Sequence, residues 1–186
     1  MSVPAPPERL DGAGVVLVRV GGEHTAGIHE AKARSHRELW LWMDWAGEEP
    51  DPPAVATAFV ERAVAVWDAG TEFTYAITAA DSGEVIGGCG IMTRRGPGRL
   101  EIGYWVRTDR AGAGVATEAA RLATDAAFGI TGIETACIHH DAANEASGRV
   151  AEKLGYRTVD RFATTIDNAG ESGVEVVWEL SRAGRP

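Results

Sequence analysis

Residues 99–128 read RLEIGYWVRTDRAGAGVATEAARLATDAAF, and the order of patterns in this stretch decides the fold. The apolar run over 99–106 predicts a strand, the glycines that follow predict a tight turn, and the alanine-rich sequence over 114–128 predicts a helix. The first turn of a helix leaves about four N–H groups unpaired and carries partial positive charge, so this junction can hold a phosphate through its backbone. A plain structural turn would use the same glycines, and that alternative stays open.

Length and charge limit the classes of function. A chain of 186 residues is long enough for one domain with a full core. It carries 18 Lys and Arg against 27 Asp and Glu, a net charge of −9, which disfavours nucleic acid and anionic membranes and favours a cationic amine or basic peptide. Cys89 and Cys137 lie in apolar runs without a CxxC partner, so we expect buried free thiols, and no long apolar run indicates a membrane span. We therefore expect a cytoplasmic protein.

The periodicity along the chain predicts the order β-α-α-β-β-β-α-β-α-β-β. Hairpins with turn residues between their strands occupy the middle and the end, and a βαβ unit lies between them. We expect a flexible arm over 1–9, a single domain over 10–181 and a tail over 182–186. The expected strands are 14–20, 73–80, 84–92, 99–106, 132–140, 156–166 and 173–181, and the expected helices are 25–40, 53–67, 114–128 and 144–155.

Five segments recur together, in this order, in one protein family. The chain resembles the GCN5-related N-acetyltransferases (GNAT), and within them the RimJ/RimL-like branch that acetylates protein N-termini and small amines. The resemblance covers about residues 10–181. It implies an α+β (α/β three-layer) fold with a mixed, mostly antiparallel, twisted sheet of about seven strands and about four helices, and acetyl-CoA as donor with no metal. The segments are WMDW (42–45), GEVIGGCG (83–90), EIGYWV (101–106), AGAGVATEAARLATDAAF (111–128) and NEASGRVAEKLGY (144–156).

The resemblance also implies which residues hold acetyl-CoA. The family loop has the form R/Q-x-x-G-x-G/A, which puts Ala111 where relatives have Arg or Gln and leaves Arg110 one residue early. Backbone N–H groups of the loop would then hold the pyrophosphate, while the preceding strand and Asn144 contact the pantetheine arm. The expected cofactor-binding residues are Tyr104, Trp105, Val106, Arg110, Ala111, Gly112, Ala113, Gly114, Val115, Ala116, Thr117, Asn144 and Ser147.

Acetyl transfer to an amine needs few catalytic groups. An alkyl ammonium has a pKa near 10, so a base must accept its proton, and Glu101 is our first choice, with an outward-facing strand position as the alternative. The Val106 amide can stabilise the oxyanion. In many relatives a tyrosine protonates the leaving thiolate, but Ala151 stands at that place. Ser147 is therefore expected to take this role, and its alternative is an ordinary residue at a helix N-terminus.

The acceptor site is expected around the segment WLWMDW (40–45). The resemblance implies that this loop overhangs the acceptor, so Trp42, Asp44 and Trp45, together with Glu101, are the expected substrate-binding residues, although the tryptophans would equally suit the core. The adjacent His139 and His140 point to opposite faces of a strand, which disfavours a shared metal and leaves a proton relay as a minor alternative.

Two other classes of function remain open. A noncatalytic CoA-responsive module would keep the fold, and the departures at Ala111 and Ala151 are the features that favour it. An unrelated phosphate-binding or oxidoreductase domain is the third reading. For an enzyme, the acceptor can be a protein N-terminus, a polyamine, an aminoglycoside-like antibiotic or a metabolic amine, and a homodimer is compatible with the sequence.

Overall fold

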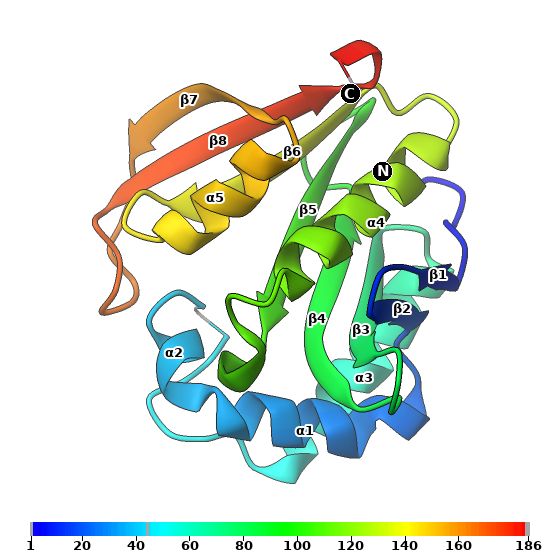
Figure 1. The fold of residues 1–186 in the computed structure, drawn as a ribbon, viewed down its shortest axis with the longest axis vertical. Coiled ribbons are helices and arrows are strands. Elements are labelled where there is room, and N and C mark those ends of the chain that lie inside the picture. Colours follow the sequence, from blue (N-terminus) through cyan, green and yellow to red (C-terminus); the bar gives the residue numbers. More distant parts are fainter. Residues whose placement is uncertain (1, 44, 185–186) are drawn as a thin grey trace.

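The computed structural model describes residues 2–43 and 45–184, and within them the sheet has eight strands (Figure 1). Their order is β1-β2-β3-β4-β5-β6-β8-β7, and every neighbouring pair is antiparallel except β5 and β6. The predicted mostly antiparallel mixed sheet is confirmed, with one strand more than expected, because β1 pairs with β2. The strands are β1 (Arg9–Asp11), β2 (Val15–Arg19), β3 (Glu72–Ala79), β4 (Val85–Met92), β5 (Arg99–Val106), β6 (Thr135–Asp141), β7 (Arg157–Ala163) and β8 (Val174–Ser181).

The helices follow the predicted pattern with one break. The sequence predicts a single helix over 25–40, but the structure divides it at Ser35, which is fully buried. The Ser35 hydroxyl oxygen accepts a hydrogen bond from the backbone N–H of Thr108 at 2.9 Å, so the break serves a contact with a distant loop. The helices are α1 (Thr25–Arg34), α2 (His36–Trp40), α3 (Pro53–Asp68), α4 (Val115–Gly129) and α5 (Glu145–Lys153).

Helices cover both faces of the sheet, which gives the three layers expected (Figure 1). On one face α4 packs closely on the sheet, because Ala119, Ala123 and Ala127 present only methyl groups to it and are fully buried. On the other face α1 and α3 contribute Ile28 and Val60 to a second, smaller cluster. The layers therefore place α4 and α5 on one side of β5, and α1 and α3 on the other.

The described residues near both ends of the chain contact the rest of the domain. In the segment predicted as a flexible arm, the Val3 N–H donates to the Gly70 carbonyl at 2.9 Å, and the Tyr75 hydroxyl donates to the Pro7 carbonyl at 2.8 Å. The expected tail begins with a short 3₁₀ turn over Arg182–Gly184. The flexibility of the arm stays a prediction. Across the described parts of the chain, no helix combines the length and apolarity needed to cross a membrane.

Candidate active site

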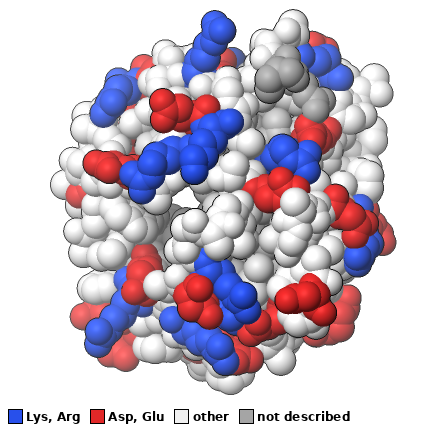
Figure 2. All heavy atoms as spheres, viewed as in Figure 1, with Lys and Arg blue, Asp and Glu red and all other residues white. Residues whose placement is uncertain are grey.

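The centre of the sheet is open along half of one strand pair. In the described residues, β5 and β6 pair over three positions only, from Arg99↔Thr135 to Glu101↔Cys137. Beyond Glu101 the two strands diverge, and Figure 1 shows β5 running toward the loop before α4 while β6 runs beneath α5. Figure 2 shows an opening in this face between α5 and that loop. The space between the diverging ends of β5 and β6 is called the gap below.

Backbone hydrogen-bonding groups of β5 point into the gap. The Arg107 N–H donates to the Ile86 carbonyl at 2.8 Å, which fixes the hydrogen-bonding phase of the β4–β5 pair. Because such groups alternate in direction along an antiparallel pair, the N–H and C=O groups of Tyr104 and Val106 point away from β4. An extended chain that carries amides can therefore bind along β5 as an extra strand would.

Trp105 differs from its two neighbours in this respect. Its backbone lies opposite Gly88 and faces β4, and its indole lies across β4, where a side chain at Gly88 would meet the ring nitrogen at 2.5 Å. Its side chain is therefore directed to the face covered by α1 and α3. Of the residues expected to bind the cofactor, the structure places Trp105 on the opposite side of the sheet from α4.

The loop before α4 has the backbone shape of an anion site. Gly112 and Gly114 both have positive φ, 76° and 83°, a conformation that side chains rarely adopt. The helix hydrogen bonds begin with the Glu118 N–H donating to the Gly114 carbonyl at 3.0 Å. The N–H groups of Val115, Ala116 and Thr117, in the first turn, therefore have no helical carbonyl to pair with. The predicted strand, loop and helix are all present at this place.

A buried arginine that the sequence analysis missed holds the start of this loop. The Arg107 guanidinium, 3% exposed, pairs with Glu84 at 2.5 Å and with Asp109 at 2.6 Å. These hydrogen bonds raise the pKa of Arg107, which stays charged. Arg110 also pairs with Glu84, at 3.2 Å. In this structure the Arg110 side chain thus turns toward the β3–β4 turn, and Ala111 supplies no polar side chain.

Ser147 and Asn144 lie at the N-terminus of α5, across the gap from β5. The Asn144 side-chain oxygen accepts from the Ser147 N–H at 3.2 Å and so caps the helix. The Ser147 hydroxyl lies 3.0 Å from the hydroxyl of Tyr104, which reaches it from β5. The structure thus brings together three residues predicted for the cofactor site, and one of them is the predicted acid.

Glu101 lies at the closed end of the gap and is 4% exposed. Arg94 and Arg95 both pair with its carboxylate, and the Arg94 Nε donates to it at 3.0 Å. Burial alone would raise the pKa of the Glu101 carboxyl, but the two guanidinium groups outweigh it and leave the pKa below its usual range. The candidate base is therefore a charged carboxylate whose oxygens already hold two cations.

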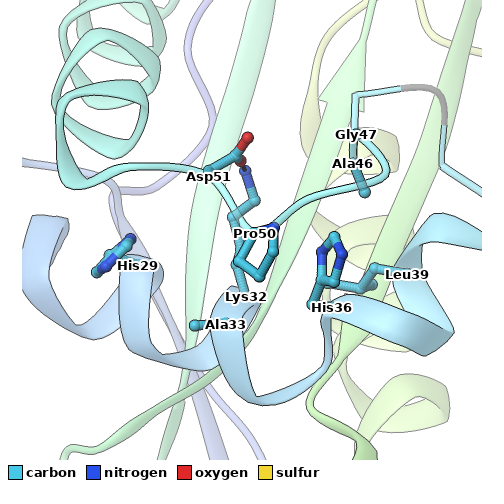
Figure 3. A pocket seen from close by; sticks show the side chains of 9 residues that line it. All are labelled: His29, Lys32, Ala33, His36, Leu39, Ala46, Gly47, Pro50 and Asp51. Carbon is cyan, nitrogen blue, oxygen red and sulfur yellow. Dashed lines mark hydrogen bonds and ion pairs between the residues drawn. The ribbon is translucent and has the colours of Figure 1, made fainter.

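The expected acceptor-binding tryptophan lies on the face of the sheet opposite α4. The Trp45 ring, 42% exposed, lies 6.1 Å from the ring of Trp105, and the ammonium of Lys32 lies 4.7 Å from its centroid. Lys32 also pairs with Asp51, and Figure 3 shows these two side chains reaching toward each other from α1 and the loop before α3. The Lys32 ammonium therefore lies over one face of the Trp45 ring.

The other members of this group are placed differently. Trp42 is partly exposed, and a side chain added at Gly170 would meet its ring at 3.1 Å, so the β7–β8 loop packs against it. The Gly170 N–H donates to the Leu41 carbonyl at 3.2 Å. Asp44 lies outside the described residues. The described parts of this loop, 41–43 and 45–52, thus contact α1 through Lys32 and Asp51 and the β7–β8 loop through Gly170.

The two histidines of β6 point to opposite faces, as expected. His140 accepts from the Trp178 indole N–H at 2.8 Å through Nε2, so its proton is on Nδ1, which lies 2.7 Å from the Asp141 carbonyl. His139 lies on the same face as Glu101, and its Nδ1 is 3.2 Å from a carboxylate oxygen of Glu175. Within the described residues, no group of three or more His, Cys, Asp or Glu is arranged to hold a metal.

Comparisons with known proteins identify the family and the fold. The family model for the GNAT acetyltransferase domain matches residues 15–157. No curated protein matches the sequence at a significant level. Among solved structures, RimJ of Mycobacterium smegmatis, in complex with a CoA disulfide, has a TM-score of 0.86 at 19% identity, covering 100% of this chain and 92% of that one.

Two further solved structures share the fold. RimL, the ribosomal L7/L12 α-N-protein acetyltransferase in complex with coenzyme A, has a TM-score of 0.83 at 16% identity, covering 95% of this chain and 99% of its own. The ribosomal-protein-S5-alanine acetyltransferase of Vibrio fischeri has a TM-score of 0.82 at 14% identity, covering 96% and 99%. The family match spans most of the chain, and the chain belongs to the GNAT acetyltransferase family, whose enzymes transfer acyl groups.

Proposed function

We propose that the protein transfers an acetyl group from acetyl-CoA to a primary amine, with a protein N-terminus as the leading class of acceptor. The observation that carries this proposal is the gap: backbone groups of Tyr104 and Val106 face it, and it leads to the N-terminus of α4. A pantetheine arm has two amides that match the first feature, and a pyrophosphate matches the second.

The residues at the gap suit the acyl donor in a definite orientation. Backbone N–H groups over 112–117 would hold the pyrophosphate, with Arg110 able to join only by leaving Glu84. The oxygen of Asn144 is used by the helix cap, so its amide N–H₂ is the group that can donate to a pantetheine carbonyl. The Val106 N–H would donate to the oxyanion, and the Ser147 hydroxyl would protonate the leaving sulfur.

The acceptor would approach from the opposite face of the sheet. Alternate residues of β5 point to opposite faces, so Tyr104 lies on the side of α4 and α5 while Glu101 and Trp105 lie on the other. Trp45 lies beside Trp105 on that second face. The donor and the amine would thus meet in the gap from two sides. The net charge of −9 favours a cationic acceptor, and the likeness to RimL, an α-N-protein acetyltransferase, and to the S5-alanine acetyltransferase favours a protein N-terminus.

Two residues compete for the role of base. Glu101 stays our first candidate, and its two arginine partners make it a weak proton acceptor because they lower its pKa. His139 is the second: it would lie opposite Gly103 if the β5–β6 pairing continued, and Glu175 lies beside its ring. Glu101→Gln should lower kcat at neutral pH more than it raises the KM for acetyl-CoA. If Glu101→Gln keeps its turnover and His139→Gln loses it, the assignment passes to His139.

The function is tested with purified protein, acetyl-CoA and three acceptors. These are a short peptide with a free N-terminus, the same peptide with a blocked N-terminus, and a polyamine. We expect thiol release and a product heavier by one acetyl group with the free peptide, and none with the blocked one. If only the polyamine is acetylated, acetyl transfer to an amine stands, but a protein N-terminus is the wrong class of acceptor. An α-amino group has a pKa of about 8, so kcat/KM should rise toward that pH.

A noncatalytic CoA-binding module is the second candidate, because the sequence has Ala111 and Ala151 where many relatives carry polar side chains. The same experiment separates the two functions. Stabilisation by CoA without thiol release for any amine would favour the module. Stabilisation by NAD or ATP but not by CoA would overturn both.

A further inference from the structure

The Tyr104 side chain makes a contact across the gap and has no role in the reaction proposed above. Its hydroxyl lies 3.0 Å from the Ser147 hydroxyl oxygen and 3.2 Å from the Ser147 carbonyl oxygen. It therefore links β5 to α5 at the level where the strands diverge. Burial raises the pKa of Tyr104 to about 12, with the bond to Ser147 opposing the rise, so the phenol keeps its proton at neutral pH.

Counting protons shows that this contact has two arrangements. Tyr104 and Ser147 each have one hydroxyl proton. In the first, the phenol donates to the Ser147 carbonyl, and the Ser147 hydroxyl donates to the phenol oxygen, so the serine proton is occupied. In the second, the phenol donates to the Ser147 hydroxyl oxygen, and the serine proton is free to point into the gap. Rotation of two O–H bonds interconverts them without moving a heavy atom.

We infer that Tyr104 is the positioning residue for Ser147, an inference that rests on the proposed function. A thiolate forming in the gap attracts the serine proton and so selects the second arrangement, in which Tyr104 stabilises the serine oxygen. Helix α5 supplies no other hydroxyl, and Ala151, one turn further on, is fully buried with no polar side-chain atom. The hydroxyl that orients Ser147 thus comes from the strand across the gap.

The step balances in atoms and electrons. As the tetrahedral intermediate collapses, the C–S bond breaks and its electron pair passes to sulfur. Sulfur takes the proton of Ser147, while the Tyr104 O–H keeps its hydrogen bond to the serine oxygen and stabilises the negative charge that develops there. The serine oxygen recovers a proton from solvent, which has received the one lost by the attacking amine. The phenol is less acidic than a thiol, whose pKa is about 8.5, so Tyr104 stays protonated throughout and acts by orienting Ser147.

A second tyrosine, Tyr156, offers a control variant that distinguishes a positioning role of Tyr104 from a purely structural one. Tyr156 is buried and Tyr104 is partly buried, and the Tyr156 hydroxyl lies 2.6 Å from the Thr124 hydroxyl on α4 and has no bond to Ser147 among the described contacts. Tyr104→Phe and Tyr156→Phe each remove one hydroxyl from a pair of hydroxyls and keep the ring. A merely structural role predicts that both variants lose stability and keep kcat.

The experiment measures kcat and the KM for acetyl-CoA in wild type, Tyr104→Phe, Ser147→Ala, the double variant and Tyr156→Phe. We expect Tyr104→Phe to lower kcat by about ten-fold or more with KM within about two-fold, since general acid catalysis contributes about 10²–10⁴. The double variant should be no slower than Ser147→Ala, because Tyr104 acts through Ser147. Thermal unfolding confirms that each variant is folded, and Tyr156→Phe should keep the wild-type kcat.

Two results would overturn the inference. One is a wild-type kcat in folded Tyr104→Phe, and the other is a double variant whose two losses multiply, which would make Tyr104 independent of Ser147. Failure of the proposed function looks different, since wild type itself would then release no thiol with any acceptor. The wild-type assay is therefore the first measurement in the series.

Discussion

The glycine at the N-terminus of α4 allows a paired test of the anion site. Gly114 and Gly132 have the same φ of +83°, and at both positions an added Cβ would meet nothing within 4 Å. Alanine in this conformation costs about 1–2 kcal/mol. Gly114→Ala and Gly132→Ala should therefore lower the melting temperature alike, by about 2–4 °C per kcal/mol for a domain of this size. The backbone strain is therefore the same in the two variants, and only the place of the substitution in the fold differs.

The two variants should differ in how much acetyl-CoA raises their melting temperatures. At about 100 times the wild-type Kd, the ligand stabilises the folded state by about 2.7 kcal/mol. Loss of one backbone hydrogen bond to a phosphate costs about 1.5 kcal/mol, which is about ten-fold in Kd. The stabilisation of Gly114→Ala should then fall to about 1.4 kcal/mol, so its ligand-induced rise in melting temperature is about half that of Gly132→Ala.

Thermal unfolding of wild type and both variants, with and without acetyl-CoA at one concentration, measures this difference. The ligand-induced rise in Gly132→Ala should equal that of wild type. Equal rises in the two alanine variants would refute the reasoning, because the loop around Gly114 would then contribute no more to CoA binding than a turn elsewhere. A smaller rise in Gly132→Ala would refute it as well.

Three further predictions concern the surroundings of the site. The Asp141 carboxylate accepts five hydrogen bonds from Ala143, Ser172, Gly173 and Val174; burial raises and these bonds lower its pKa, which lies below its usual range. Asp141→Asn should lower the free energy of unfolding by about 2 kcal/mol at neutral pH. Urea titrations should show the difference from wild type beginning to close below about pH 4, the usual pKa of an unfolded Asp, and disappearing as pH falls through the lower pKa of the folded protein. Trp45→Leu should raise the KM of a cationic acceptor several-fold and leave that of acetyl-CoA unchanged in steady-state kinetics; a change in the acetyl-CoA value instead would contradict its place on the acceptor face. Ser35→Ala removes the acceptor of the Thr108 N–H, so the variant should lose about 1 kcal/mol of unfolding free energy and bind CoA more weakly in calorimetry. An unchanged CoA affinity would show that the contact at Ser35 does not influence the loop before α4.

Local patterns predicted most of the elements. The apolar run over 99–106 is bounded by turn residues on both sides, and β5 has those same limits. The glycine turn and the alanine-rich helix that follow are also where the sequence places them. Such patterns are visible because each depends on neighbours in sequence, and a strand or an amphipathic helix repeats them over a whole element.

The contacts missed are long-range. The helix break at Ser35 depends on a bond to Thr108, 73 residues away, and a hydroxyl in a helical pattern gives no sign of it. The buried Arg107 depends on Glu84 from another hairpin. The contacts of Glu101 with the two arginines could have been expected from the hairpin. Met92 pairs with Glu101 across it, so arginines just beyond Met92 in the turn can fold back onto that carboxylate.

The divergence of β5 from β6 gives the sheet an edge in its interior. Exposed strand edges are sites where chains associate, and proteins guard their outer edges against it. If the protein binds acetyl-CoA as proposed, this inner edge must stay open, because Tyr104 and Val106 would pair with the pantetheine arm. The bound cofactor would then cover the edge and connect the two halves of the sheet. Saturation with the cofactor would also keep the edge from pairing with another extended chain.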